Sequence, residues 1–223
     1  MPVAAKRLGR PRNEQRTAQR REHILDAAAK SFARHGFHDC DVEDLAERLG
    51  VGKGTIYRQF PAKSDLFLAA VDREVRRMHD AVCIARDAVD EPLEKIERAT
   101  QAYLSYCDAH PELVELLILE RAVFKDRKKP TYFEHREVNV DRWRERFRGL
   151  IAAGRVRRMN VEQITDVISN LLYGTMFTNF FAGRTKSFQQ QSREIIDVVF
   201  HGILSDTERV KRAGRKPLAG VRK

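Results

Sequence analysis

The stretch that decides the fold runs from Val42 to Phe60 and reads VEDLAERLGVGKGTIYRQF. Apolar residues recur at helical spacing up to Leu49, and Gly50 then provides the conformational freedom that the end of a helix commonly needs. Gly52 opens the turn into a second short helix, which mixes small, basic and aromatic residues. A short helix, a tight turn and another short helix are the arrangement by which a helix-turn-helix inserts side chains into the DNA major groove. The stretch therefore favours DNA reading over catalysis.

Helix signals on both sides extend this unit into a three-helix head. A first helix is expected to begin near Arg16 and to stop at Gly36, and Asp41 suits the N-cap of the helix that follows. A Phe-Pro pair ends the third helix, because a residue before proline is pushed out of helical geometry. We therefore predict a helix-turn-helix DNA-binding domain over residues 16–62, preceded by a disordered basic arm over residues 1–15.

The remainder of the chain also has the pattern of helices. It contains no hairpin-turn signal and no sustained alternation of apolar and polar residues. Apolar residues recur at helical spacing in further segments, namely 66–78, 92–109, 111–125, 131–153, 161–182 and 188–205. We predict an all-α protein, in which a helical bundle for effector binding and dimerisation occupies residues 63–206 and a basic tail occupies residues 207–223.

The net charge of +10 is concentrated at the two ends of the 223-residue chain. Residues 1–22 hold seven basic and two acidic side chains, residues 208–223 hold seven basic and one acidic, and the body between them is nearly neutral. A basic tail beside a nearly neutral body is typical of an arm that contacts a polyanion, although basic tails also serve solubility alone.

Each exposed side chain of the third helix matters, because this helix spans only about two turns. Ile56 and Phe60, four residues apart, are expected to anchor it to the core, and Gly54 lets its backbone approach the groove floor. Lysine, threonine and tyrosine side chains can bond phosphates or base edges. The expected DNA-contacting residues are Lys53, Gly54, Thr55, Tyr57, Arg58, Gln59 and, at the start of the next helix, Lys63. The plainer alternative is a solvated helix that happens to carry a lysine and an arginine.

Residues 42–66, which read VEDLAERLGVGKGTIYRQFPAKSDL, together with the earlier pair Gly36-Phe37, resemble the DNA-binding domain of TetR-family transcriptional regulators. The resemblance implies a three-helix head, an all-helical ligand-binding body, a homodimer, and release of operator DNA when a small molecule binds. Two positions depart from the family pattern. Cys40-Asp41 stand where threonine is common, and Gly52 stands where serine is common, which removes one phosphate-binding hydroxyl.

Residues 7–12 read RLGRPR and are similar to an AT-hook core, in which Gly-Arg-Pro lies in a narrow minor groove. Arginine is drawn to the enhanced negative potential of A·T tracts. Leu8 replaces the first arginine of that core, so the match is partial. We expect Arg10 and Arg12 to contact the minor groove beside the half-site.

Apolar stripes in the last two helices are the candidates for a dimer interface. One short recognition helix contacts too few base pairs, whereas a two-fold protein with heads about 34 Å apart fits successive major grooves. Paired across a two-fold axis, these helices form a four-helix bundle; alternatively, the stripes are only the core of one protomer. The predicted interface comprises Ile164, Val167, Ile168, Leu171, Leu172, Ile195, Ile196, Val199 and Ile203.

A small-molecule pocket is expected among the middle helices, where aromatic and aliphatic residues are plentiful. Its predicted lining comprises Tyr103, Tyr106, Leu117, Glu120, Phe124, Trp143, Phe147, Tyr173 and Phe177. Each of these side chains, taken alone, is more typical of an ordinary core than of a ligand contact. Charged residues between positions 120 and 136 favour either an anionic effector or a solvated loop.

Other functional classes find little support in the sequence. It contains no nucleophile elbow, phosphate-binding glycine-rich loop or His-Glu-x-x-His pattern, so neither an enzyme nor a cofactor is predicted. Cys40, Cys83 and Cys107 lack the paired spacing of a disulfide framework or a metal site, and no metal is predicted. No apolar run approaches the ~20 residues that span a bilayer. The basic N-terminus lacks the apolar run of a signal peptide, so no membrane partner and a cytoplasmic location are expected.

These patterns predict a sequence-specific transcriptional regulator, a homodimer that binds a palindromic double-stranded DNA operator. Its simplest form is a repressor that an unknown small-molecule effector releases. Two alternatives stay open: a ligand-independent architectural protein that binds DNA with both basic tails, and an effector-binding module without DNA-reading activity.

Overall fold

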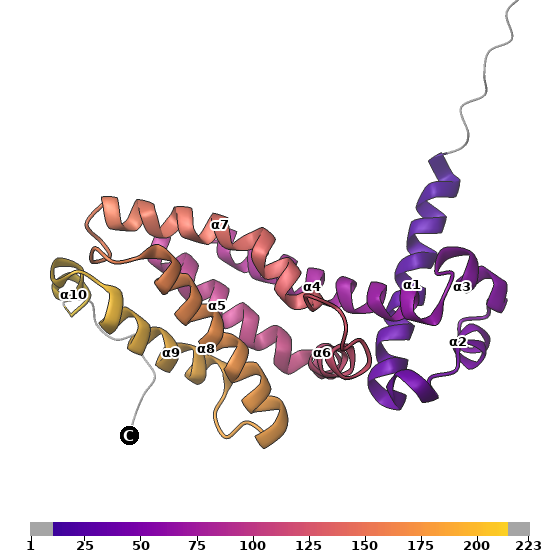
Figure 1. Ribbon diagram of the computed structural model, residues 1–223. Helices are drawn as coiled ribbons and strands as arrows, with labels where there is room; N and C mark the ends of the chain where they lie inside the picture. The colour runs from indigo at the N-terminus through magenta and orange to yellow at the C-terminus, as the bar shows by residue number, and fades with distance from the viewer. Residues whose placement is uncertain (1–10, 214–223) are drawn as a thin grey trace, which may run out of the picture.

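The computed structural model describes residues 11–213, which fold into ten helices and contain no strand (Figure 1). The helices are α1 (Pro11–Asp39), α2 (Val42–Arg48), α3 (Lys53–Gln59), α4 (Lys63–Asp87), α5 (Pro92–Ala109), α6 (Pro111–Val123), α7 (Thr131–Ala152), α8 (Val161–Ala182), α9 (Phe188–Ile203) and α10 (Asp206–Ala213). An isolated bridge between Val156 and Leu204 is the only β-type pairing within this range. The predicted all-α class is confirmed.

The head consists of α1, α2 and α3. Helix α1 begins at Pro11 rather than near Arg16, because the fixed φ of proline suits the first turn of a helix. Part of the segment predicted as a disordered arm is therefore helical. Gly36 interrupts the helical conformation with φ 77° and ψ 176°, as expected for the stop, although the residues up to Asp39 resume it.

The turn between α2 and α3 has the cap chemistry that the sequence predicts. Asp41 is the N-cap of α2, and its side chain accepts a hydrogen bond from the backbone N–H of Glu43 at 2.7 Å. Gly50 follows α2 with φ 62°, a left-handed conformation that side chains disfavour. Gly52 is the N-cap of α3. Asp41 thus caps the start of α2, and the two glycines shape the tight turn that leads into α3.

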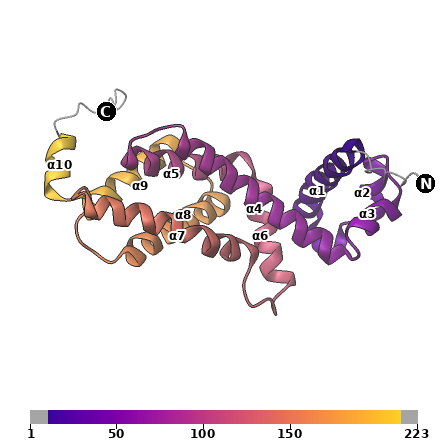
Figure 2. The same ribbon diagram turned by 90° about the horizontal axis from the view of Figure 1, so that it is seen from above.

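Helix α4 connects the head to the body and packs against elements of both. It contacts α1 at its start and then runs beside α5 and α7 (Figure 2). Helix α4 is therefore the element that joins the head to the body.

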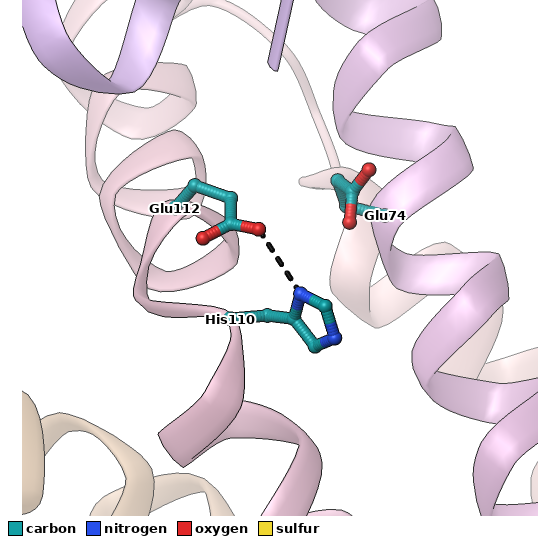
Figure 3. A group of neighbouring side chains, drawn as sticks. All are labelled: Glu74, His110 and Glu112. Atoms are coloured by element: carbon teal, nitrogen blue, oxygen red, sulfur yellow. Dashed lines mark hydrogen bonds and ion pairs between the residues drawn. The ribbon is translucent and has the colours of Figure 1, made fainter. Parts of the chain in front are cut away.

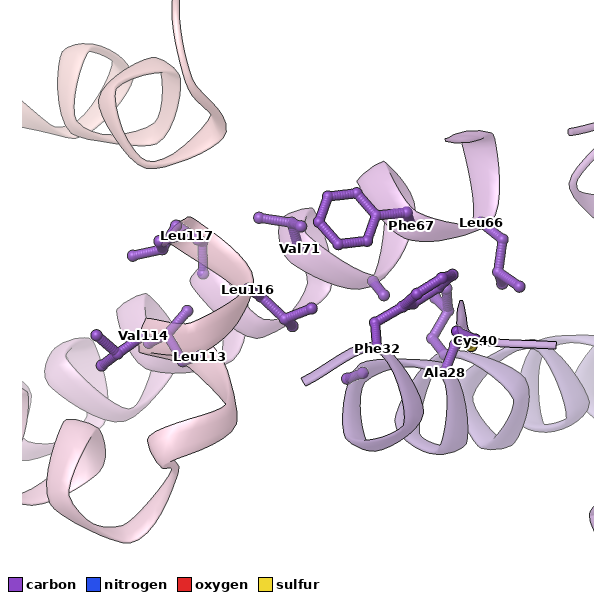
Figure 4. Close-up of a cluster of buried hydrophobic side chains, with 14 of the residues drawn as sticks. Ala28, Phe32, Cys40, Leu66, Phe67, Val71, Leu113, Val114, Leu116 and Leu117 are labelled. Atoms are coloured by element: carbon purple, nitrogen blue, oxygen red, sulfur yellow. The ribbon is translucent and has the colours of Figure 1, made fainter. Parts of the chain in front are cut away.

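Head and body share a continuous apolar core around the first half of α4 (Figure 4). Phe32 from α1, Phe67 from α4 and Leu116 from α6 are fully buried there. Phe124, which follows α6, stacks on Phe67 at a ring-centroid distance of 5.5 Å and meets Phe37 edge-on at 5.3 Å. Aromatic pairs at these separations add favourable energy beyond the buried area, so α6 is packed together with the head.

A second apolar cluster fills the opposite end of the body, among α5, α7, α8 and α9. At this end, the segment predicted as a basic tail begins with helix α10, which ion pairs hold against the body. Arg155 bonds Glu208 at 2.7 Å, and Arg212 bonds Glu97 at 2.9 Å. The hydrogen bond from Arg155 lowers the pKa of the Glu208 carboxyl against the opposing effect of burial. None of the described helices is long and apolar enough to cross a membrane.

Candidate nucleic-acid interface and body cavity

Helix α3 is anchored on one side and open on the other. Ile56 and Phe60 are 1% and 2% exposed, so they fasten the helix to the head core as their spacing predicts. Lys53, Gly54 and Arg58 are exposed on the outward side. Gly54 faces open space, since a Cβ added at this position would meet no neighbouring group within 4 Å. Another molecule can therefore approach the backbone of α3 closely.

Lys53 stands at the first position of α3 and forms an ion pair across the turn. Its Nζ lies 2.9 Å from Oε2 of Glu43 on α2. This hydrogen bond, together with the negative charge of Glu43, raises the pKa of the lysine. Both side chains are substantially exposed, and an exposed pair of this kind is weak and easily exchanged.

Tyr57 is the first departure from the expected outward face. It is half-buried and packs against the head core, whereas the sequence suggested a freely exposed ring. Thr55 and Gln59 are also half-buried. On so short a helix, the large ring of Tyr57 reaches the edge of the core.

Lys63 is the second departure, because its ammonium group already has protein partners. Nζ donates to the backbone carbonyl of His38 at 2.8 Å and lies 5.3 Å from the centroid of the Phe37 ring. These contacts tie the start of α4 to the end of α1. Binding of a DNA phosphate by Lys63 would compete with them.

The outer surface of α1 adds basic residues that were counted in the charge of the N-terminal segment but not chosen as contacts. Arg16, Arg20 and Arg21 are exposed. The guanidinium of Arg21 lies 4.4 Å from the centroid of the Phe60 ring, next to α3. Of the two predicted minor-groove residues, Arg10 and the side chain of Arg12 lie outside the described residues.

The buried guanidinium of Arg73 joins α4 to α1. Arg73 on α4 is 3% exposed and donates to Glu22 of α1 at 2.8 Å and to the adjacent Glu74 at 2.6 Å. A longer contact of 3.4 Å joins it to Asp26. Tyr106 on α5 donates to Glu74 at 3.3 Å, which extends the network from the head into the body.

Glu74, His110 and Glu112 form the group best placed to hold a metal ion within the described part of the chain, with ligand atoms within 4.8 Å of one another (Figure 3). Protein partners already engage these groups. Nδ1 of His110 lies 3.0 Å from Oε1 of Glu112, and Glu74 bonds Arg73 and Tyr106. The cluster therefore has a structural explanation as part of the α4–α5–α6 junction.

A cavity of about 120 Å³ lies among α4, α5, α7 and α8. Three predicted pocket residues, Tyr103, Trp143 and Phe147, line it. The remaining predictions lie elsewhere, namely Tyr106, Leu117, Glu120, Phe124, Tyr173 and Phe177. Residue type alone does not distinguish a cavity wall from packed core, and the lining residues His79 and Arg136 were missed for that reason.

The predicted pocket residues outside this cavity have other contacts. The buried carboxylate of Glu120 accepts from the hydroxyl of Thr131 at 2.7 Å and pairs with Arg127 at 2.8 Å, which fixes the loop before α7. Phe124 belongs to the aromatic contact with the head. Tyr173 packs against the ring of Tyr132 at 4.8 Å.

The predicted dimer stripe divides into two faces. Ile164, Ile196, Val199 and Ile203 are buried within the protomer's own core, and Ile168, Leu172 and Ile195 are half-buried. Of the predicted set, Val167 and Leu171 are exposed, at 55% and 39%. The exposed apolar residues Val198 and Phe181, each at 70%, were not predicted. Apolar spacing marks a helix as two-sided without revealing which side meets a partner.

Comparison with known proteins agrees with this geometry. Residues 24–70 match the family described as bacterial regulatory proteins, tetR family. The HTH-type transcriptional repressor AcnR of Corynebacterium diphtheriae is 28% identical over 190 residues, which cover 84% of this chain and 93% of that protein. The HTH-type transcriptional activator FasR of Mycolicibacterium smegmatis is 28% identical over 109 residues, so this match spans only about half of either protein (48% each).

Solved structures share the fold over most of the chain. The fatty acid degradation regulator FadR from Bacillus halodurans superposes with a TM-score of 0.67 at 17% identity, covering 81% of this chain and 98% of that one. A regulator from Saccharomonospora viridis, solved in complex with choline, gives a TM-score of 0.68 at 21% identity and covers 84% and 99%. The helix-turn-helix segment of this chain therefore matches the tetR family of bacterial regulatory proteins, and its helices are arranged as in these structures.

Proposed function

We propose that this protein is a sequence-specific, DNA-binding transcriptional regulator that acts in the cytoplasm as a homodimer. The observation that carries the proposal is the placement of α3, whose buried Ile56 and Phe60 turn Lys53, Gly54 and Arg58 outward from a rigid head. A short helix presented in this way fits the DNA major groove. The exposed Arg21 of α1 lies against the Phe60 ring at the end of α3 and suits a flanking phosphate.

The homodimer would form through the outward side of α8 and α9. Val167, Leu171 and Val198 are exposed there, and burial of such residues against a second copy gives an isologous interface. Two heads held about 34 Å apart would read successive major grooves, so the operator should be a palindrome.

Repression with release by a small molecule is the mode of action that we favour. Several relatives, AcnR among them, are named as repressors, whereas FasR is named as an activator. The cavity beside α4 supports an effector site, because α4 also carries the head through its contact with α1. An effector that binds one position of α4 better than another changes DNA affinity by that difference in binding free energy.

Selection of bound sequences from random DNA duplexes, followed by footprinting with the full-length protein, tests this function. A single protected palindrome is the expected result. Diffuse protection without a consensus would instead indicate an architectural DNA-binding protein, and the absence of any selective binding would indicate an effector-binding module. A reporter gene placed behind the selected operator then distinguishes repression from activation.

A further inference from the structure

The cavity among α4, α5, α7 and α8 has a wall that is mostly apolar. Its lining contains no carboxylate and a single guanidinium, that of Arg136. The volume of about 120 Å³ is close to the roughly 150 Å³ that suffices for a benzene-sized molecule in an apolar protein cavity. Shape and polarity therefore admit a small, largely apolar ligand.

His79 on α4 is the polar group in this wall that lacks a partner. Its Nε2 is buried and has no hydrogen-bond partner among the described residues. On its other side, the ring of His79 stacks on that of His135 at 5.7 Å, and Nε2 of His135 bonds Asp72 at 2.7 Å. A buried polar nitrogen without a partner costs free energy, which a ligand's hydrogen bond would recover.

The electrostatics of the cavity disfavour both signs of charge on a ligand. The guanidinium of Arg136 repels cations, and Trp143 already has the guanidinium of Arg146 at 5.3 Å from its ring centroid. For an anion, Arg136 is not free, because it pairs with Asp166 at 3.0 Å and bonds Asn170 at 3.0 Å. Burial lowers the pKa of His79 to about 4, so its ring is neutral at pH 7.

We propose that the cavity binds an uncharged, mostly apolar molecule, roughly the size of a substituted benzene ring, through a hydrogen bond between the ligand's hydroxyl or carbonyl group and Nε2 of His79. A hydroxyl suits either tautomer of the ring, since it can donate or accept. Because His79 belongs to α4, this bond ties the ligand to the helix that carries the head. The inference rests on the proposed function only in identifying this ligand as the effector.

Fluorine NMR titrations of the full-length protein, without DNA, test the proposal with two matched pairs of probes. 4-Fluorophenol and fluorobenzene differ only by a hydroxyl, and 4-fluorobenzamide and 4-fluorobenzoate differ only by charge at nearly equal size. We expect the phenol to bind about threefold to tenfold more tightly than fluorobenzene, as one net hydrogen bond provides. The benzamide should bind at least about tenfold more tightly than the benzoate, because the anion must give up its hydration in a mostly apolar cavity whose guanidinium already pairs with Asp166.

Variants at position 79 assign the preference to the histidine. In His79→Leu the phenol and fluorobenzene should bind equally, whereas His79→Gln, which keeps a side-chain donor and acceptor, should retain a hydroxyl preference. His201→Leu, a change at an exposed histidine of α9, is the matched control and should behave like the unaltered protein. Circular dichroism melts show that each variant is folded; if His79→Leu is not, the probe preferences and His79→Gln still decide the question.

Two results would overturn the proposal. One is a protein that binds none of the probes or shows no preference for the hydroxyl. The other is a preference for 4-fluorobenzoate that disappears in Arg136→Gln, which would assign an anion site to the cavity. Since the titrations contain no DNA, their failure leaves operator binding by α3 untouched, and a failed operator selection would leave a measured hydroxyl preference standing.

Discussion

Lys53 is bound to Glu43 before any DNA arrives, and this pairing determines what the lysine can contribute to binding. A phosphate or a guanine edge must replace the Glu43 carboxylate, which lies 2.9 Å from Nζ. Because both partners are exposed, the exchange costs little.

Substitution of Lys53 by alanine tests the contact directly. We expect Lys53→Ala to weaken operator binding roughly fivefold to a hundredfold, as the loss of a specific base or strong phosphate contact does. Lys186→Ala is a close control, because Lys186 is similarly exposed and pairs with Glu194 at 2.8 Å far from α3. Equal losses in the two variants, measured by fluorescence anisotropy at several salt concentrations, would contradict a role specific to Lys53.

The buried imidazole of His79 predicts how stability depends on pH. Burial lowers the pKa of His79 from 6.5 to about 4, so below pH 6.5 the unfolded chain binds this proton first. The stability associated with a neutral His79 is therefore complete above pH 6.5 and is lost as the pH falls toward 4. Its loss amounts to at most about 3 kcal/mol.

Urea denaturation at pH 7.5 and pH 4.5 measures this contribution. His79→Leu should lose less stability between the two pH values than the unaltered protein, since no proton is gained at that position on unfolding. The difference between the two proteins isolates the contribution of position 79. An identical pH dependence would show that His79 is solvated and already charged at the lower pH.

Among the helices, the contact between α1 and α4 includes one buried guanidinium beside its apolar core. Arg73 bonds Glu22, Asp26 and Glu74, and Glu74 is itself only 2% exposed. Removal of the cation would leave the buried Glu74 carboxylate with only the exposed Arg77 as a cation, at 3.8 Å, which is a costly arrangement.

We expect Arg73→Met to lower the free energy of unfolding by about 3 kcal/mol. The added change Glu74→Gln should recover part of this loss, because it removes the unpaired buried charge. Arg76→Met, at an exposed arginine one turn from Asp72, should change stability by no more than about 0.5 kcal/mol. If the loss of unfolding free energy in the double variant equalled the sum of the losses in the two single variants, the network would not be coupled as described.

How far the sequence predicted these helices depends on the kind of signal. Cap and turn residues act locally, so Asp41, Gly50 and Gly52 were placed correctly, and the buried pair Ile56 and Phe60 followed from spacing alone. Tertiary contacts are not encoded in that way. Three features arise from residues distant in the chain. They are the partial burial of Tyr57, the hydrogen bond from Lys63 to the His38 carbonyl, and the ion pair of Arg155 with Glu208 that holds α10.

At the scale of the whole molecule, α8 and α9 carry apolar residues on two sides, and only one side packs into the protomer. Ile196 and Val199 point into the core, whereas Val198 is 70% exposed. An exposed apolar surface of this kind is typical of an interface with another chain. The periodicity of the sequence revealed the stripe, but only the packing of the body separates its inner from its outer face.

An aspartate on the outer face should therefore prevent dimerisation. We expect Val198→Asp to shift the protein from dimer to monomer in light scattering coupled to size exclusion, because each copy would bury a carboxylate without a partner. Val138→Asp, at a valine of α7 that is 80% exposed, is the matched control and should leave the assembly unchanged. A monomer already present in the unaltered protein, or a dimer that persists in Val198→Asp, would contradict this interface.

The aromatic contact between Phe37, Phe67 and Phe124 has a practical consequence for protein engineering. A chimera that joins the head of one regulator to the body of another is cut between these two units. In this chain such a cut would separate rings that pack against each other, although Phe124 is far along the sequence from the other two. A functional hybrid would have to carry α6 with its original head, so the specificity for DNA and that for the inducer are not freely interchangeable parts.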